Sequence, residues 1–284
     1  MNTTTAPSAG GAGKTNMNES NFFFRLEWHK DRMILNHQIY RLQHFNGPWT
    51  GGNDHFIFYK TRELVDQYQA FFDEHPGFAP ERIFELGLWD GGSMVFWYEL
   101  FHPSKHVGVD LQNKKNSPYF QRYLSEQHVK DRVKPYWATD QADSARLRQL
   151  WKTEFNQPLD LVIDDASHLY GPTKASFETL FPLLRPGGLY IIEDWAWGHW
   201  KDFFAPDHAW AAERPLTALI LELLEAVGTG MGLIRRLHVF QGFVVVERGI
   251  GSANGAFSLD SQILRRDEPA ELKYQEPPQM ALET

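Results

Sequence analysis

The sequence contains no cysteine among its 284 residues. Disulfide bonds, thiolate metal sites and cysteine nucleophiles are therefore excluded, and a cytoplasmic location is the expectation for such a chain. Basic residues are outnumbered, with 28 lysines and arginines against 36 aspartates and glutamates, which gives a net charge of -8. Because no basic cluster is present to neutralise phosphates, nucleic acid is a poor candidate partner.

Long apolar runs are missing as well. None approaches the ~20 residues that a membrane-spanning helix needs, and the N-terminus lacks the charged-then-apolar pattern of a signal peptide. We therefore expect no membrane association. With 42% hydrophobic residues, the chain can bury a full core in one large domain, or in one domain with an appendage.

The first twenty residues have no apolar periodicity, which predicts a disordered tail over 1–20. Within it, Gly13-Lys14-Thr15 looks like the end of a phosphate-binding loop. The position five before Gly13 is Ser8 rather than glycine, and no strand precedes it. Nucleotide binding is therefore not expected at this place.

Residues 21–78 are predicted to form a helical appendage. A short helix is expected first, then a loop around 46–52, and then a helix that Thr61 caps and Pro76 ends. Phe22, Phe23 and Phe24 make the start of this segment too apolar for a free tail, so it is a candidate for covering a partner subunit in a homo-oligomer. A catalytic domain over 79–250 and a C-terminal extension over 251–284 complete the expected organisation.

Strands and helices alternate through the catalytic region. Such alternation predicts an α/β fold with a doubly wound, seven-stranded, mostly parallel sheet. The last two strands are close in sequence, which indicates an antiparallel edge hairpin. The expected strands are 82–87, 106–111, 133–139, 159–164, 189–193, 233–240 and 243–247.

A glycine loop follows the first of these strands. Gly87 and Gly91 allow the backbone to approach a small polar ligand. Ser93 lies in the first turn of the following helix, and the free N–H groups of this turn face the ligand. Glu85 adds a negative charge, which suits a ligand with cationic groups. Because Trp89 replaces the second glycine of the dinucleotide fingerprint, NAD is disfavoured.

Further polar residues follow the next two strands. Asp110, at the end of the second, is placed to accept the hydroxyls of a ribose, and a solvated strand-end aspartate is the alternative. Asp140 and Gln141 offer an acceptor and an amide to an adenine edge, although helix capping by Asp140 or Asp143 is a nearly equal alternative. Asp110, Asp140 and Gln141 are candidate cofactor-binding residues.

Four carboxylates and a histidine follow the fourth and fifth strands: Asp164, Asp165 and His168, then Glu193 and Asp194. Carboxylates this close would raise one another's pKa unless a cation is present. All-oxygen ligation suits a hard ion such as Mg²⁺. Helix capping or solvation of these acids is the alternative interpretation.

Two motifs carry a family resemblance. The glycine loop resembles the first motif of class I S-adenosylmethionine methyltransferases, and IDDASH followed by FPLLRPGGLYIIEDW is similar to the macrocin and mycinamicin type of metal-dependent sugar O-methyltransferases and to the cephalosporin-hydroxylase-like group. The resemblance covers roughly 80–195. It implies a Rossmann-like methyltransferase fold, metal ligation by Asp165, Glu193 and Asp194, His168 as general base and Asp164 facing the cofactor.

The expected function is therefore S-adenosylmethionine-dependent and Mg²⁺-dependent O-methylation of a small-molecule hydroxyl, on a sugar-bearing or other secondary metabolite. Carboxyl methylation and a non-catalytic binding module are the alternatives. The resemblance does not extend to the acceptor. Aromatic residues after the fifth strand either wall the acceptor site or pack a loop: Trp195, Trp197, Trp200, Phe203 and Phe204.

Overall fold

The computed structural model describes residues 25–42, 54–113, 115–230, 232–252 and 257–266. The tail predicted at 1–20, the Phe22–Phe24 segment and the loop around 46–52 lie outside these ranges. Part of the extension at 251–284 also lies outside them. No helix within the described ranges is long and apolar enough to cross a membrane.

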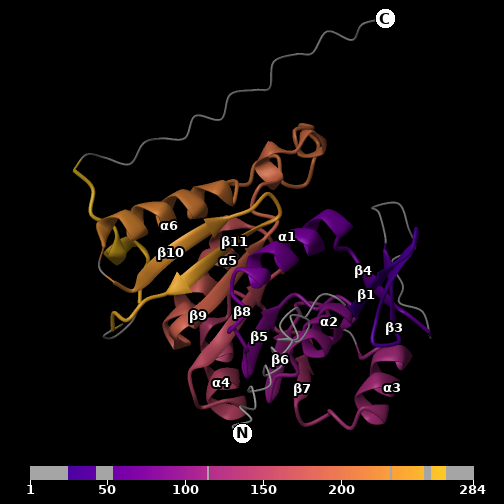
Figure 1. Cartoon of the computed structure of the whole chain (residues 1–284). Helices are drawn as coiled ribbons and strands as arrows, with labels where there is room; N and C mark the ends of the chain where they lie inside the picture. The colour runs from indigo at the N-terminus through magenta and orange to yellow at the C-terminus, as the bar shows by residue number, and fades with distance from the viewer. Residues whose placement is uncertain (1–24, 43–53, 114, 231, 253–256, 267–284) are drawn as a thin grey trace, which may run out of the picture.

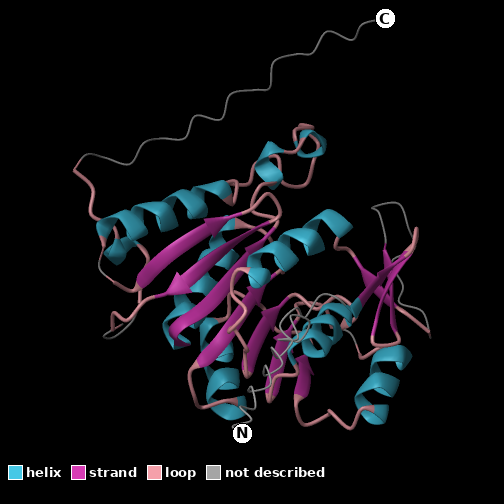
Figure 2. Ribbon diagram, viewed as in Figure 1, coloured by secondary structure: helices cyan, strands magenta, loops and turns pink. Residues whose placement is uncertain are grey.

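A seven-stranded sheet forms the centre of the molecule (Figures 1 and 2). Its order is β10-β11-β9-β8-β5-β6-β7, with the last five strands of this order parallel and β11 antiparallel to both of its neighbours. The doubly wound sheet with an antiparallel edge hairpin is thus confirmed. The strands are β5 (Arg82–Leu86), β6 (Lys105–Val109), β7 (Val133–Tyr136), β8 (Leu159–Asp164), β9 (Leu184–Glu193), β10 (Ile234–Val239) and β11 (Phe243–Arg248).

Helices cover both faces of this sheet, which explains why all six residues of β8 are buried. One apolar core joins the sheet to α1 (Arg62–Asp73), α2 (Gly92–Phe101) and α3 (Pro118–Glu126). The other core joins it to α4 (Ser144–Glu154), α5 (Tyr170–Leu180) and α6 (Thr217–Thr229). Short 3-10 turns complete the described chain: η2 (Phe181–Leu183), η3 (Trp197–His199), η4 (Lys201–Phe203) and η5 (Asp260–Gln262).

The N-terminal segment differs from its prediction. In place of the short helix expected within 21–58, the described residues form a four-stranded sheet in the order β1-β2-β3-β4, with bounds β1 (Leu26–Trp28), β2 (Arg32–Leu35), β3 (Gln38–Leu42) and β4 (Phe56–Phe58). Asn36 and His37 link β2 to β3 with φ of 48° and 69°, as a two-residue hairpin turn requires. The alternation of buried Met33 and Leu35 with more exposed neighbours fixes the inward face.

The β4–α1 connection brings this small sheet to the larger one. Thr61 caps α1 as predicted, accepting a hydrogen bond from the N–H of Leu64 at 3.2 Å. Tyr68 on α1 then stacks on Phe243 of β11, with ring centroids 4.0 Å apart. Residue 60, immediately before the cap, is thereby held at the edge of the sheet where the predicted site lies.

Candidate functional site

The glycine loop lies at the carboxyl end of β5, where the strand order reverses between β6 and β8. Gly87 and Gly91 have φ of 87° and 91°, in the left-handed region that favours glycine. A Cβ on Gly87 would lie 2.0 Å from the backbone oxygen of Asp165. The loop and the first acidic pair are therefore in direct backbone contact.

Asp110 holds this loop in shape. Its Oδ2 accepts hydrogen bonds from the N–H groups of Leu88 and Trp89, both at 2.9 Å, and its Oδ1 accepts one from Gln112 at 2.8 Å. The side chain is 8% exposed. Its contact with the ribose of a cofactor stays a prediction, as does that of Ser93, which lies half-buried in the first turn of α2.

Glu85 is buried beneath the glycine loop. Both it and His106 have no exposed side-chain surface, and His106 Nε2 lies 2.8 Å from Glu85 Oε2. A direct contact of Glu85 with a cofactor stays a prediction.

Gln141 and Asp164 form a buried polar network on the α5 side of the sheet. The amide of Gln141 donates to Asp164 at 3.1 Å, and its oxygen accepts from the N–H of Ser167 at 2.8 Å. Ser176 and Tyr190 donate to Asp164 at 2.6 and 2.9 Å. Burial raises the pKa of Asp164 to about 6, even though the hydroxyl donors and His168 lower it.

This network orients the loop that carries His168. Asp164 points away from the acidic centre, as expected, but it bonds to protein groups and is 2% exposed. Asp140 is exposed and accepts from the N–H of Ala142 at 2.8 Å in the turn before α4, whereas Asp143 is the N-cap of α4 and accepts from the N–H of Arg146 at 2.9 Å. Direct cofactor contacts by Asp140, Gln141 and Asp164 stay predictions.

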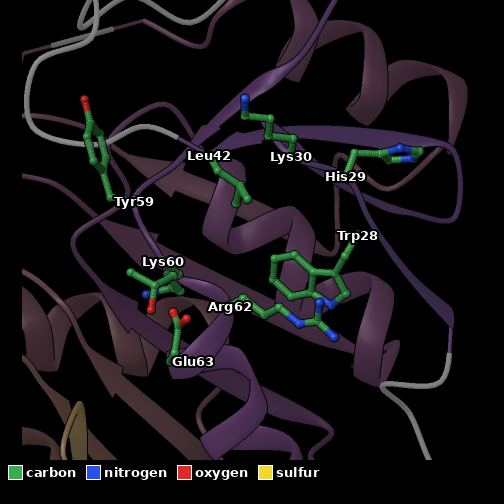
Figure 3. Close-up of a pocket in the computed structure, with 9 residues that line it drawn as sticks. Trp28, His29, Lys30, Leu42, Tyr59, Lys60, Arg62 and Glu63 are labelled. Atoms are coloured by element: carbon green, nitrogen blue, oxygen red, sulfur yellow. The ribbon is translucent and has the colours of Figure 1, made fainter.

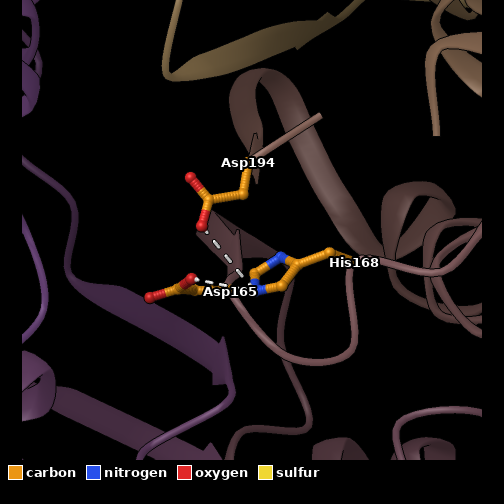
Figure 4. A group of neighbouring side chains, drawn as sticks. All are labelled: Asp165, His168 and Asp194. Atoms are coloured by element: carbon orange, nitrogen blue, oxygen red, sulfur yellow. Dashed lines mark ion pairs between the residues drawn. The ribbon is translucent and has the colours of Figure 1, made fainter. Parts of the chain in front are cut away.

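Asp165, His168 and Asp194 converge at the ends of β8 and β9 (Figure 4). Their ligand atoms all lie within 4.8 Å of one another. His168 Nε2 is 3.8 Å from Asp165 Oδ1 and 3.9 Å from Asp194 Oδ2. His168 and Asp194 both have positive φ, 56° and 53°, which costs free energy and is a feature of functional sites.

Glu193 is oriented differently from these three. Lys60 Nζ lies 2.7 and 2.6 Å from its two oxygens, and Tyr68 donates to Oε1 at 2.8 Å. Lys60 also bonds to Asp165 Oδ2 at 2.7 Å. Sequence reasoning missed Lys60 and Tyr68, because they lie 105 and 125 residues before Asp165 and Glu193 respectively and carry no local motif.

The charges around this centre shift one another's titration. Burial raises the pKa of Glu193 above its ordinary range and Asp165 raises it further, against the effect of Lys60. Burial also raises the pKa of Asp194, which His168 opposes. Burial lowers the pKa of Lys60, but Asp165 and Glu193 together raise it by more. Lys60 therefore remains a cation.

The group formed by Asp165, His168 and Asp194 fits a divalent ion. Ligand bonds of about 2.0–2.4 Å place opposite ligands roughly 4–5 Å apart, which matches the spread of these atoms. Two carboxylates with open positions suit Mg²⁺ and Mn²⁺, because both ions prefer oxygen ligands.

The aromatic segment after β9 mostly packs the protein. Trp197 is 3% exposed and donates to the backbone oxygen of His168 at 2.8 Å, so it fixes the backbone of the histidine. Trp195 donates to the backbone oxygen of Phe240 at 2.8 Å. Among the aromatic residues predicted to wall the acceptor site or to pack a loop, Phe204 is exposed, with 41% of its surface accessible.

A cavity of about 460 Å³ opens beside Lys60 (Figure 3). Trp28, Leu42 and Tyr59 contribute aromatic and apolar surface, and Arg62 lies over the Trp28 ring with Cζ 5.6 Å from its centroid. His29, Lys30, Lys60, Thr61 and Glu63 complete the lining.

Comparison with known proteins identifies the catalytic region. The methyltransferase domain family matches residues 84–195. Demethylmacrocin O-methyltransferase of Streptomyces fradiae is 29% identical over 212 residues, which cover 68% of this chain and 50% of the relative. The 8-demethyl-8-alpha-L-rhamnosyl tetracenomycin-C 2'-O-methyltransferase of Streptomyces olivaceus is 35% identical over 151 residues, which cover 49% of this chain and 36% of the relative.

A solved methyltransferase structure is also similar to this chain. The MycE methyltransferase from the mycinamycin biosynthetic pathway, in complex with Mg and SAH, is 28% identical with a TM-score of 0.51, covering 68% of this chain and 51% of that one. The chain spans half or less of the length of the curated relatives it matches. Residues 84–195 thus match the methyltransferase domain family, and the chain resembles the sugar O-methyltransferases of the macrocin and mycinamicin type.

Proposed function

We propose that this protein is an S-adenosylmethionine-dependent, divalent-metal-dependent O-methyltransferase that acts on a hydroxyl of a glycosylated small molecule. One observation carries the proposal: Gly87 of the glycine loop packs directly on Asp165 of the acidic centre. A donor bound at the loop and an acceptor held at the centre would then meet at one edge of the sheet, as methyl transfer requires.

The protein groups have distinct proposed tasks. His168 accepts the proton of the acceptor hydroxyl, and the hydroxyl oxygen then forms a bond to the methyl carbon as the bond from carbon to sulfur breaks. The uncharged S-adenosylhomocysteine leaves. Asp165 and Asp194 would hold a divalent ion, which would supply the Lewis acidity that lowers the pKa of the acceptor hydroxyl.

The acceptor class follows from the relatives and the cavity. The relatives include an O-methyltransferase of an L-rhamnosyl tetracenomycin and one of L-olivosyl-oleandolide, both glycosylated small molecules. In this chain the cavity beside Lys60 offers Trp28, Tyr59 and Leu42, surfaces suited to the apolar faces of a sugar or its aglycone. We propose that the N-terminal sheet, within residues 21–78, supplies acceptor contacts to a catalytic domain over 79–250.

Labelled S-adenosylmethionine should test this function. The protein should transfer labelled methyl groups to glycosylated polyketides and not to their aglycones, and calorimetry should show S-adenosylhomocysteine binding with NAD inert. Cofactor binding without transfer to any hydroxyl or carboxyl compound would favour the non-catalytic module instead.

The His168→Ala variant separates hydroxyl from carboxyl acceptors. A hydroxyl must lose a proton, so the rate should fall about 10²–10⁴-fold. A carboxylate acceptor is already an anion, so a small loss would favour carboxyl methylation. Whether the protein forms a homo-oligomer stays a prediction, and light scattering would test it.

A further inference from the structure

Lys60 is a buried ammonium with all of its donors used. The side chain is 5% exposed, and its Nζ bonds to Asp165 Oδ2 and to both oxygens of Glu193, at 2.7, 2.7 and 2.6 Å. An ammonium has three N–H donors, so each has an acceptor here. The contacts therefore define a built cation position inside the acidic centre.

The position is supported from outside the catalytic sheet. Lys60 lies between β4 and the Thr61 cap of α1, and Tyr68, two turns along α1, donates to Glu193 Oε1 at 2.8 Å. Tyr68 in turn stacks on Phe243. The segment before the catalytic domain thus inserts a cation and a hydroxyl donor into the site.

Asp165 divides the centre into two halves. Its Oδ2 faces Lys60, while its Oδ1 lies on the side of His168. Glu193 lies in the Lys60 half, with both oxygens bonded, and is 2% exposed. Asp194 lies in the other half, where its side chain is 40% exposed.

We propose that Lys60 is a fixed internal cation that takes Glu193 out of the metal ligand set and leaves Asp165 and Asp194 to hold the divalent ion, with His168 beside it. Glu193 is then a positioning residue that anchors Lys60. The inference rests on the proposed function, because that function supplies the ion. It differs from the ligand set that the family resemblance implies, in which Glu193 binds the metal.

The charges give the inference measurable consequences. The ammonium repels a divalent ion in the neighbouring half, so Lys60→Met should tighten metal binding by at least about tenfold. The double variant Lys60→Met/Glu193→Gln removes one positive and one negative charge and keeps the shapes. It should bind metal within about threefold of the wild type, whereas Asp194→Asn removes a ligand and should weaken binding by at least about tenfold.

Titration of metal-free protein with Mn²⁺, followed by calorimetry and by electron paramagnetic resonance, tests these expectations without cofactor or acceptor. Lys174→Met is the matched control. Lys174 also bonds to two carboxylates and a tyrosine, Glu222, Asp260 and Tyr170, but on α5 and away from the centre. Its loss should leave the Mn²⁺ affinity unchanged.

If the double variant binds Mn²⁺ as weakly as Asp194→Asn does, the inference is overturned, because Glu193 would then be a ligand. Failure of Lys60→Met to tighten binding, or absence of Mn²⁺ binding in both wild type and Lys60→Met, would also overturn it. If Lys60→Met does not fold by circular dichroism, the double variant decides alone. Metal binding without S-adenosylhomocysteine binding or methyl transfer would instead refute the proposed function.

Discussion

At the scale of single residues, one substitution at Asp110 tests both its hydrogen bonds to the glycine loop and its expected contact with the cofactor. It fixes the N–H groups of Leu88 and Trp89, and we expect it to accept the cofactor ribose. Asp110→Ala should weaken S-adenosylhomocysteine binding by about 1.5–3 kcal/mol, the range for hydrogen bonds to a charged group. Calorimetry measures the loss. Asp131→Ala, at an exposed aspartate with no proposed role in the site, is the control, and equal affinity in Asp110→Ala would remove Asp110 from the site.

The sequence predicts some of the site residues and misses others for a physical reason. Asp165, His168 and Asp194 follow two parallel strands, whose ends meet at one edge of the sheet, so their convergence could be expected. Lys60 follows β4 of a different sheet. Only the packing of α1 on β11 brings it to Glu193, and no local pattern reports such a contact.

At the scale of elements, the β2–β3 turn is a sensitive point. His37 is exposed with φ of 69°, a conformation in which a β-branched side chain is strained. His37→Val should lower the free energy of unfolding by about 1–2 kcal/mol, and His37→Gly should not lower it comparably. Urea unfolding measures both. Equal effects of the two substitutions would mean that the backbone strain is not the cause.

This hairpin also shows why the N-terminal segment was mispredicted. Its strands are three to five residues long, and Asn-His replaces the usual Asn-Gly of a two-residue turn. Aromatic residues spread through the segment are compatible with the residue spacing of a helix and with that of a strand. The strands of the large sheet are buried apolar segments that alternate with helices, so their sequence pattern is easier to recognise.

Glu154 ties the end of α4 to two strands. Burial opposes its ionisation, but hydrogen bonds from Lys105, Tyr136 and Lys134 lower its pKa from 4.5 to about 2. A carboxyl with a lowered folded pKa stabilises the protein above its unfolded pKa, and this stability is lost as pH falls through the folded value. The relevant window therefore runs from about pH 5 down to about 2.

We expect Glu154→Gln to be less stable than the wild type at pH 7 by about 1–3 kcal/mol, allowing for solvent screening. The difference should shrink as the pH falls through that window. Denaturant unfolding at several pH values measures it. A difference that does not vary with pH would show that packing, and not charge, is responsible.

At the scale of the whole molecule, different parts of the fold hold the glycine loop and the acidic centre, which lie at the same edge of the large sheet. Asp110 and β6 hold the glycine loop, while the N-terminal sheet and α1 bring Lys60 to the acidic centre. The doubly wound, mostly parallel sheet with its edge hairpin could be predicted because strands and helices alternate along the chain and the last two strands are close in sequence. The coupling of the small sheet to the centre could not, because it depends on long-range packing.

This division predicts how the protein responds to loss of its metal. EDTA should abolish turnover and Mg²⁺ should restore it, because the ion lowers the pKa of the acceptor hydroxyl. S-adenosylhomocysteine binding should survive chelation largely intact, because the hydrogen bonds from the loop N–H groups to Asp110 do not involve the ion. The comparison needs chelated and Mg²⁺-loaded protein on one acceptor in metal-free buffer, with calorimetry of the cofactor on both. Equal turnover would mean that Asp165 and Asp194 have a structural role only, whereas loss of both properties on chelation would mean that the ion organises the loop as well.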